Sequence, residues 1–443
     1  MFQFKIGIAQ VDYTPRIGLP LMGNFRDDYS SRGVHDPLYS HAIVVENKTG
    51  AKVALVSLDI CMVDRDNVAF MREQMYRETG IPPQRILIAG THTHSGPAPK
   101  RYGLLPTSPE AEVSRFLRKA ASSVKLADKN RKASELRIGY AEENRLSFTR
   151  RLAGRDGKTH MNWEKLDPDF VVKAFGKIDP QVITMAVHQG GNPKAVAVNF
   201  GLHPAILAGD NWLYSADYPG YLYEALRKIS GGDLCTLFFN GCCGNVNHLD
   251  YSDPLQGRGY QMTQRVGYML AAAVQEAMGK SVEIRGDTIA VNSERLTVKR
   301  LKISEKQKKW SEDVLRRAKT NKAKGQVDGL PDDFYATAYL DMYRKQHEDD
   351  QVEIMAIRIG DLGIVGLPGE IFSEFGLEIK KRSLATHTIV IELANDAIGY
   401  IPTKISFRQG GYEPSTGSTM YQPGTGEAIA KQAIKQLNQL FGK

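Results

Sequence analysis

Segments with strand-like and helix-like patterns alternate irregularly along this chain, and hairpins stand among them. Residues 41–64 predict one hairpin, because two β-rich runs flank the turn residues Asn-Lys-Thr-Gly, and residues 352–370 predict another. Residues 66–80 and 257–278 instead carry the spacing of amphipathic helices. Hairpins next to helical connections do not fit a uniform series of parallel βαβ units. We therefore expect an α/β fold of the α+β mixed kind, with mixed β-sheets flanked by helices, arranged either as one mixed sheet or as two packed sheets.

The composition is that of a folded chain with a sizeable core. Of 443 residues, 42% are hydrophobic and 24% are charged, which is ordinary globular usage and excludes disorder as the main state. No run of about 18 apolar residues occurs, so no transmembrane helix is expected. The first residues, MFQFKIGIAQ, predict a strand rather than a leader. We expect a soluble protein, either cytoplasmic or exported after losing a leader.

The positive charge of the chain is concentrated in one segment. Residues 299–324 contain eleven Lys or Arg against three Asp or Glu, whereas the remainder contains 47 of each kind. Only Trp310 interrupts the run, and nucleic-acid binding needs basic residues interleaved with aromatic ones or a known module. We therefore expect no nucleic-acid partner and interpret the segment as a solvated helical arm. An anionic partner or membrane surface is the alternative.

One design occurs three times: an apolar strand, a Gly or Pro turn, and then a side chain that can bind metal. His92 and His94 follow a short buried run, and residues i and i+2 of an extended backbone point to the same side. His203 follows another apolar run, and Glu370 follows the Pro-Gly turn after the second hairpin. Neutral imidazole is the usual zinc ligand. The repetition points to a metal site, and the alternative is a set of ordinary core histidines and a helix-start glutamate.

Several short motifs of the sequence resemble motifs in the catalytic domain of neutral ceramidases, which belong to the neutral/alkaline non-lysosomal ceramidase superfamily. The matching words are GIAQVDYTP, LVSLDI, GTHTHSGPAP, LSFTRR, KIDPQV, NFGLHP, SADYPGYL, GLPGEIF and GGYEPSTGSTMYQPG. THTHSGP is the most specific of them, and its order with the later words is hard to obtain by chance. The resemblance implies a single catalytic domain over residues 1–443, with a basic helical insertion at about 299–350 and without the immunoglobulin-like C-terminal domain of ceramidases.

The resemblance also implies a zinc ion held by two histidines, a glutamate and a tyrosine. Matched word by word, these ligands are His92, His203, Glu370 and Tyr412. A position would remain open for water, as catalytic zinc requires. His94, the second histidine of the motif, would face the substrate. The arginine of LSFTRR carries over to Arg150, although Arg145 and Arg151 compete with it within a few residues.

One word departs from the family pattern. Where ceramidases have Gly-Asp-Val-Ser-Pro-Asn, this chain reads Gly-Asn-Val-Asn-His over residues 244–248. Asn247 replaces a catalytic or substrate-orienting serine, so a serine nucleophile from this loop is excluded. We expect Asn247 and Asn245 to bind substrate instead. The change also makes ceramide a doubtful substrate and favours a smaller, more polar amide or ester.

Two further features each allow two interpretations. The adjacent Cys242 and Cys243 could bind metal or oxidise, but small residues that fill a tight loop are the simpler explanation. Asp217, in SADYPG, could orient a histidine ligand from outside the metal site. Equally, it could cap a helix that begins near Pro219.

The implied chemistry is hydrolysis of an amide (N-acyl) bond by a metal-activated water. His94 and Arg150 would stabilise the oxyanion, and His94 could pass a proton to the leaving amine. Tyr412, where it does not bind the metal, could steady the tetrahedral intermediate. One alternative is a zinc-dependent esterase or lactonase that uses the same water, and another is a non-catalytic binding protein on the same scaffold. The complete ligand set argues against the binding protein. The expected partner is a small N-acyl or ester substrate.

Overall fold

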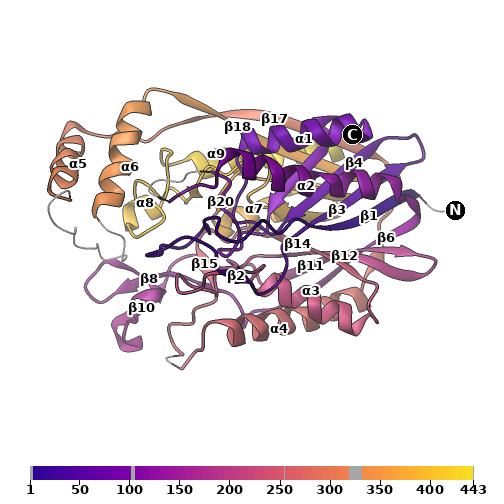
Figure 1. Cartoon of the computed structure of the whole chain (residues 1–443), viewed down its shortest axis with the longest axis horizontal. Helices are drawn as coiled ribbons and strands as arrows, with labels where there is room; N and C mark the ends of the chain where they lie inside the picture. Colours follow the sequence, from indigo (N-terminus) through magenta and orange to yellow (C-terminus); the bar gives the residue numbers. More distant parts are fainter. Residues whose placement is uncertain (1–2, 101–104, 254, 319–331, 443) are drawn as a thin grey trace.

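The computed structural model describes residues 3–100, 105–253, 255–318 and 332–442. Figure 1 shows helices on both sides of a central body of strands. The buried side chains fall into clusters that correspond to layers: one cluster between two sheets, and others between each sheet and its helices. The predicted α/β fold with mixed sheets flanked by helices is therefore confirmed.

Nine strands of the described chain form the larger sheet, in the order β14-β12-β11-β6-β1-β3-β4-β5, with β16 paired to β6. They are β1 (Phe4–Asp12), β3 (Tyr39–Asn47), β4 (Lys52–Leu58), β5 (Ile86–Gly90), β6 (Lys132–Glu142), β11 (Gln181–Gln189), β12 (Asn192–Phe200), β14 (Cys235–Asn240) and β16 (Val282–Glu283). Most neighbours are antiparallel, but β4 with β5 and β12 with β14 are parallel pairs. The hairpin predicted within residues 41–64 is β3 and β4.

The smaller sheet has the order β17-β18-β19-β21 among the described residues. Its strands are β17 (Ile289–Lys299), β18 (Asp349–Ile359), β19 (Leu362–Gly366) and β21 (His387–Ile391). The second predicted hairpin is β18 and β19, and β19 runs parallel to β21. Inward-facing side chains of the two sheets, such as Leu55 and Ile357, belong to one hydrophobic cluster, so the sheets pack face to face.

β17 and β18 pair along their whole length, from Ile289 opposite Ile359 to Lys299 opposite Asp349. The segment predicted as a basic helical insertion is therefore the excursion at the far end of this hairpin. It contains α5 (Glu305–Ala318) and α6 (Asp332–Lys345), which Figure 1 places at the end of the molecule opposite the amino terminus. Residues 319–324 of the basic run lie outside the described residues.

The helices cover the outer faces of both sheets. The larger sheet packs against α1 (Arg65–Thr79) and α2 (Glu110–Lys129) on one half, and against α3 (Tyr218–Ile229) and α4 (Tyr260–Gly279) on the other. The smaller sheet packs against α7 (Ser373–Arg382) and α9 (Thr425–Phe441). Local signals set the helix ends: Asp64 accepts hydrogen bonds from two amides of the first turn of α1, and Gly80 closes that helix with a φ of 69°.

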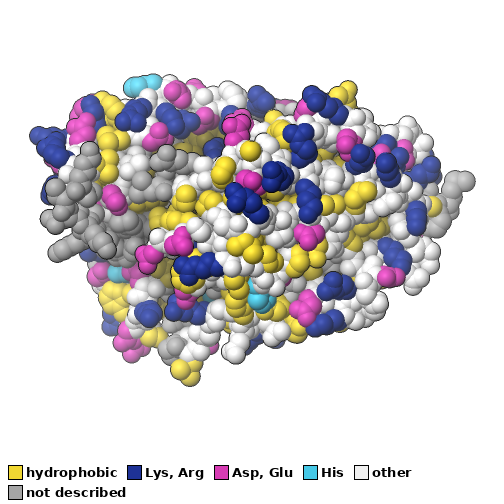
Figure 2. All heavy atoms as spheres, in the orientation of Figure 1, with side chains coloured by type: hydrophobic (Ala, Val, Ile, Leu, Met, Phe, Trp, Pro, Cys, Tyr) yellow, Lys and Arg dark blue, Asp and Glu magenta, His cyan; other side chains and the backbone are white. Residues whose placement is uncertain are grey.

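Shorter elements fill the connections between these layers. They are β2 (Gly33–Val34), β7 (Phe148–Thr149), β8 (Arg151–Gly154), β9 (Thr159–Met161), β10 (Val171–Ala174), β13 (Leu213–Tyr214), β15 (Val246–Asn247), β20 (Glu370–Ile371), β22 (Tyr400–Ile401), α8 (Ser406–Gln409), and the 3₁₀ turns η1 (Pro83–Arg85), η2 (Asn162–Glu164) and η3 (Pro168–Phe170). On the face shown in Figure 2, Lys and Arg side chains are interspersed with Asp and Glu. Within the described ranges, no helix combines the length and apolar character needed to cross a membrane.

Candidate metal centre

Three of the four predicted ligands, together with His94, lie just beyond the carboxyl ends of strands in both sheets, whereas Tyr412 follows the short helix α8. His92 and His94 follow β5, and His203 follows β12; each of these strands has a parallel neighbour. Glu370 begins β20, a few residues after β19, which is parallel to β21. Loops at the carboxyl ends of parallel strands are where α/β sheets place their ligands. The topology thus gathers residues that are far apart in the sequence.

Three of the four predicted ligands converge on one point. Oε2 of Glu370 lies 3.3 Å from Nε2 of His92 and 3.2 Å from Nε2 of His203. All three side chains are buried, and together they form a group able to hold a metal ion. Ligand atoms about 2.0–2.1 Å from a tetrahedral zinc ion are separated by about 3.3 Å. The donor set and its spacing therefore fit zinc.

Backbone carbonyl groups fix the tautomers of both histidines. Nδ1–H of His92 donates to the carbonyl of Cys61 over 2.8 Å, and Nδ1–H of His203 donates to the carbonyl of Cys243 over 2.9 Å. Each imidazole therefore turns Nε2 toward the cluster, and Nε2 is the atom that would bind a metal once it carries no proton. Burial and the nearby Arg150 lower the pKa of His203 to about 4, which keeps that ring neutral at pH 7.

The charges of this cluster are coupled. Burial alone would raise the pKa of Glu370, but His92 and His203 lower it well below its usual range. Burial would lower the pKa of His92, but Cys61 and Glu370 raise it well above its usual range. A cation at this site therefore competes with a proton on His92 and gains from a carboxylate that is already ionised.

Close backbone approaches shape the site. His92 has a φ of 75°, in the left-handed region that is costly for a residue with a side chain. A Cβ on Gly23 would lie 2.4 Å from Cγ of His94, and a Cβ on Gly244 would lie 2.4 Å from the carbonyl oxygen of Glu370. Glycine at these two positions is what lets neighbouring loops approach His94 and Glu370 so closely.

A tyrosine that the sequence did not indicate also reaches the ligand atoms. β20 and β22 pair in parallel with Glu370 opposite Tyr400, and the hydroxyl of Tyr400 lies 3.4 Å from Nε2 of His203. The predicted ligand Tyr412 lines the same pocket, and its ring packs against that of Tyr400 with centroids 5.4 Å apart. Two strands of two residues each leave no periodic pattern, so the sequence carries no signal for the proximity of Tyr400.

His94 and Arg150 both face the ligand cluster. Nε2 of His94 lies 3.4 Å from Nε2 of His92, and Nη1 of Arg150 lies 3.5 Å from Nε2 of His203. Burial and the neighbouring histidines lower the pKa of His94 well below its usual range, so this ring is neutral at pH 7. The two competing arginines point elsewhere, because Arg145 is exposed and pairs with Glu143, whereas Arg151 bonds away from the cluster.

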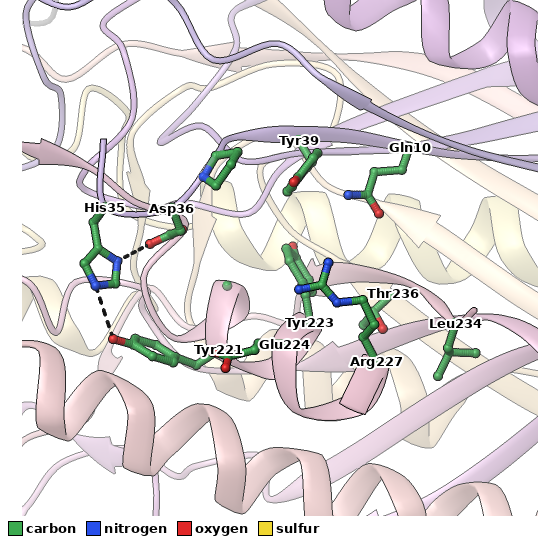
Figure 3. Close-up of a pocket in the computed structure, with 12 residues that line it drawn as sticks. Gln10, His35, Asp36, Tyr39, Tyr221, Tyr223, Glu224, Arg227, Leu234 and Thr236 are labelled. Carbon is green, nitrogen blue, oxygen red and sulfur yellow. Dashed lines mark hydrogen bonds and ion pairs between the residues drawn. The ribbon is translucent and has the colours of Figure 1, made fainter. Parts of the chain in front are cut away.

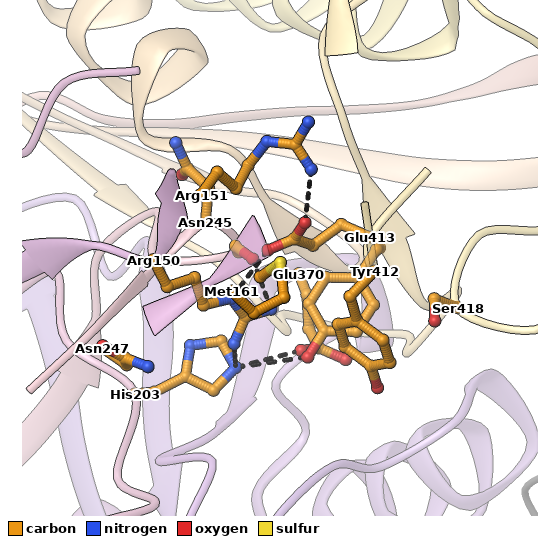
Figure 4. Close-up of polar contacts among 12 residues, drawn as sticks. Arg150, Arg151, Met161, His203, Asn245, Asn247, Glu370, Tyr412, Glu413 and Ser418 are labelled. Carbon is orange, nitrogen blue, oxygen red and sulfur yellow. Dashed lines mark hydrogen bonds and ion pairs between the residues drawn. The ribbon is translucent and has the colours of Figure 1, made fainter. Parts of the chain in front are cut away.

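Glu413 holds two buried arginines and was not predicted. Its Oε1 accepts from Nε of Arg150 over 2.7 Å, and its Oε2 accepts from Nη1 of Arg151 over 2.6 Å (Figure 4). Arg150 also donates to the carbonyl of Gly244 over 2.8 Å. The residue lies within the matching word GGYEPS, next to Tyr412, and that adjacency is the only sequence signal that could have identified it.

The two asparagines predicted to bind substrate have protein partners. Asn247 exchanges two hydrogen bonds with Asn162, of 2.7 and 2.8 Å. Asn245 accepts from the backbone N–H of Ser373 and donates to Glu374. Neither asparagine is among the described residues that line the pocket next to the ligand cluster. The structure thus shows them tying the 244–248 loop to its neighbours, and a role in substrate binding stays a prediction.

Asp217 takes the second of its two possible roles. Its carboxylate caps α3 by accepting from the backbone N–H of Tyr218 over 2.7 Å, and it accepts from the N–H of Leu207 over 2.9 Å. The histidine ligands are oriented by backbone carbonyls instead. Asp217 therefore supports the loop that follows His203 rather than the imidazole itself.

A second unpredicted carboxylate joins the segment that carries Glu370 to the loop whose Cys243 carbonyl orients His203. Glu392 accepts from the backbone N–H of Ile371 over 2.8 Å, from the N–H of Cys243 over 3.1 Å and from the Cys243 thiol over 2.9 Å. Burial raises the pKa of Glu392 to about 8. Cys243 and its neighbour Cys242 are buried free thiols, as expected of residues that fill a tight loop.

The ligand cluster forms the floor of a pocket. Its lining consists of Met22, Gly23, Phe25, Cys61, Met62, His92, His94, Leu105, Phe334, Glu370, Tyr400 and Tyr412.

A separate cavity of about 230 Å³ lies between β1, β3, β14 and α3 (Figure 3). There His35 is bonded to Asp36 and Tyr221. Among the described residues, the groups able to hold a metal all include His92, so the chemistry belongs to the first pocket.

Comparison with known proteins places these observations in a family. The model of the neutral/alkaline non-lysosomal ceramidase family, N-terminal part, matches residues 4–329. Neutral ceramidase 2 of Arabidopsis thaliana is 29% identical over 100 residues, which are 22% of this chain and 13% of that protein. Neutral ceramidase A of Dictyostelium discoideum is 22% identical over 267 residues, which are 57% of this chain and 36% of that protein. The aligned regions thus span well under half of these relatives.

The fold agrees with a solved structure. The crystal structure of the neutral ceramidase from Pseudomonas aeruginosa superposes with a TM-score of 0.77 at 18% sequence identity, covering 100% of this chain and 75% of that one. Glu370 and both tyrosines lie beyond the range that the family model matches, whereas His92, Arg150 and His203 lie within it. Because that range takes in well over half of the chain, the chain belongs to the neutral/alkaline non-lysosomal ceramidase family.

Proposed function

We propose that this chain is a zinc-dependent hydrolase that cleaves an amide (N-acyl) bond. The observation that carries the proposal is the convergence of two imidazole Nε2 atoms on one carboxylate oxygen, at 3.2 to 3.3 Å, on the floor of a pocket. Membership of a family whose named relatives are ceramidases supports the amide as the bond attacked. His92, His203 and Glu370 would hold the ion, with Tyr400 or Tyr412 as the phenolic ligand.

The residues around the cluster suit acyl transfer to water. Bound zinc would supply a water of lowered pKa and polarise the carbonyl group. His94 is neutral and within the pocket, so it can take a proton as the C–O bond forms and deliver it to the amine as the C–N bond breaks. Arg150, held charged by Glu413, presents Nη1 toward the same atoms and suits the developing oxyanion.

The first test separates water from serine as the nucleophile. Chelation should abolish hydrolysis of a panel of N-acyl substrates, and added zinc should restore it. The reason is that we assign activation of the attacking water to the bound zinc alone. A serine-directed acylating reagent should leave activity unchanged, because Asn247 stands where the family has serine. Amide and ester substrates with the same acyl group should be compared in parallel. Activity lost together with stoichiometric labelling of a serine would contradict the proposal, as would turnover of esters alone.

Replacing His94 by glutamine should lower kcat by about 10²- to 10⁴-fold, which is the usual contribution of a positioned acid–base group. The metal content should stay unchanged, because the three converging ligands are intact. Steady-state kinetics and metal analysis on the same preparation would check both expectations. A variant that keeps zinc and full kcat would remove His94 from the mechanism.

A further inference from the structure

The pocket above the ligand cluster has a polar floor and apolar walls. Its walls are formed by Met22, Phe25, Met62, Leu105 and Phe334. The pocket has a volume of only about 40 Å³, far below the roughly 300–1,000 Å³ usual for small-molecule sites, so its walls stand close together. These wall side chains carry no charge, so they suit an alkyl or aryl group better than an amine that becomes cationic on release.

Phe334 is the wall residue that comes from the excursion between β17 and β18. It is 4% exposed and packs edge-to-face on Phe25, with ring centroids 5.3 Å apart and planes at 90°. A Cβ on Gly417 would lie 3.2 Å from Cε1 of Phe334, so the loop after Tyr412 packs closely on this ring. Phe334 also belongs to an aromatic cluster with Tyr335, Trp310, Tyr339 and Tyr412. The ring is therefore held in place from several sides.

We propose that Phe334 limits the length of the acyl group, so that the site takes amides of short or compact carboxylic acids and excludes those of long-chain fatty acids. This inference rests on the proposed hydrolysis at the metal centre. The carbonyl of a substrate would lie at the floor, beside His94, and the group attached to it would extend along the apolar walls. A chain longer than the pocket would meet the fixed Phe334 ring before the carbonyl reached the floor.

The kinetic test uses N-acetyl, N-hexanoyl and N-dodecanoyl amides of one chromogenic amine. For the unmodified protein, kcat/KM should fall sharply between hexanoyl and dodecanoyl. Phe334→Ala should raise the dodecanoyl-to-acetyl ratio of kcat/KM by about tenfold or more, since steric discrimination in apolar pockets is commonly 10- to 200-fold. Phe334→Leu, which keeps an apolar side chain for packing, should give an intermediate ratio. Tyr343→Ala is the matched control, because Tyr343 bonds Glu305 of α5 and does not line the pocket.

A binding test judges the inference without catalysis. Calorimetry of the zinc-loaded protein should show hexanoate binding to the unmodified chain and dodecanoate binding only to Phe334→Ala. If no amide is hydrolysed, the proposed function is wrong, but the binding of hexanoate and dodecanoate still tests whether Phe334 limits the length of the bound chain. Equal discrimination in Phe334→Ala and the unmodified chain would overturn the inference, and so would binding of neither carboxylate. An equal change of the ratio in Tyr343→Ala would show that general loosening of α6, and not the ring, sets the limit.

Discussion

Replacing His203 by alanine is expected to empty the metal site and abolish hydrolysis. The variant removes one of the two imidazoles that lie 3.2 to 3.3 Å from Oε2 of Glu370. Losing even an outer partner of a metal ligand typically costs about 10- to 100-fold in affinity, so loss of the ligand itself should exceed about 100-fold. His92→Ala should behave alike. The zinc content measured after dialysis should fall from about one ion per chain, as a mononuclear site requires, to near zero.

His347→Ala is the matched control, because this histidine is exposed in the excursion between β17 and β18. It should keep both zinc and activity. Circular dichroism of all three variants would show whether the fold is retained, which is expected because both ligand rings lie at strand ends rather than inside a sheet. Full zinc occupancy in the folded His92 and His203 variants would refute the ligand assignment.

Replacing Glu413 by alanine is expected to destabilise the protein by about 3–5 kcal/mol, the usual cost of leaving a buried charge without its partner. Glu413 is fully buried and bonds Arg150 and Arg151, which are 4% and 1% exposed. Both guanidinium groups would lose their carboxylate in a place that water does not reach. Urea unfolding at pH 7 would measure the change. Glu143→Gln is the control: its partner Arg145 is exposed, so the loss should stay within about 1 kcal/mol.

The contribution of Glu413 should also depend on pH. Burial alone would raise its pKa, but Arg150 and Arg151 lower it below its usual value. A carboxyl group whose pKa is depressed on folding stabilises the protein fully above the unfolded pKa of about 4.3, and less as the pH falls through the folded value. The stability difference between the unmodified chain and Glu413→Gln should therefore shrink between pH 5 and pH 3. A constant difference would mean that Glu413 acts through packing alone.

Local patterns predicted much of the fold. The hairpin of β3 and β4, the closure of α1 at Gly80 and the hairpin of β18 and β19 each depend on neighbouring residues, which a sequence displays directly. The face-to-face packing of the sheets depends on which apolar faces meet, and no single segment encodes that choice. The sequence pattern allowed either one mixed sheet or two packed sheets, and it did not decide between them.

The candidate site shows the same division. His92, His203 and Glu370 share a recognisable context, a strand end followed by a turn, and the structure brings them together. Tyr400, Glu392 and Glu413 enter the site only through contacts between distant segments, such as the register of β20 with β22. The role of Asn247 was predicted from the residue that the family has at this position. Its side-chain amide instead forms hydrogen bonds with Asn162, which no local sequence pattern connects to it.

The ligands are divided between the two packed layers of strands. His92 and His203 extend from the larger sheet, whereas Glu370 follows β19 of the smaller one. An ion held by all three would act as a cross-link that closes very long loops of the chain, and closing such loops removes much of the entropy of the unfolded state. Loss of the metal should then first loosen the packing of one sheet against the other. The methyl NMR signals of Leu55 in β4 and Ile364 in β19, which belong to the cluster between the two sheets, should change before amide hydrogen exchange within either sheet rises.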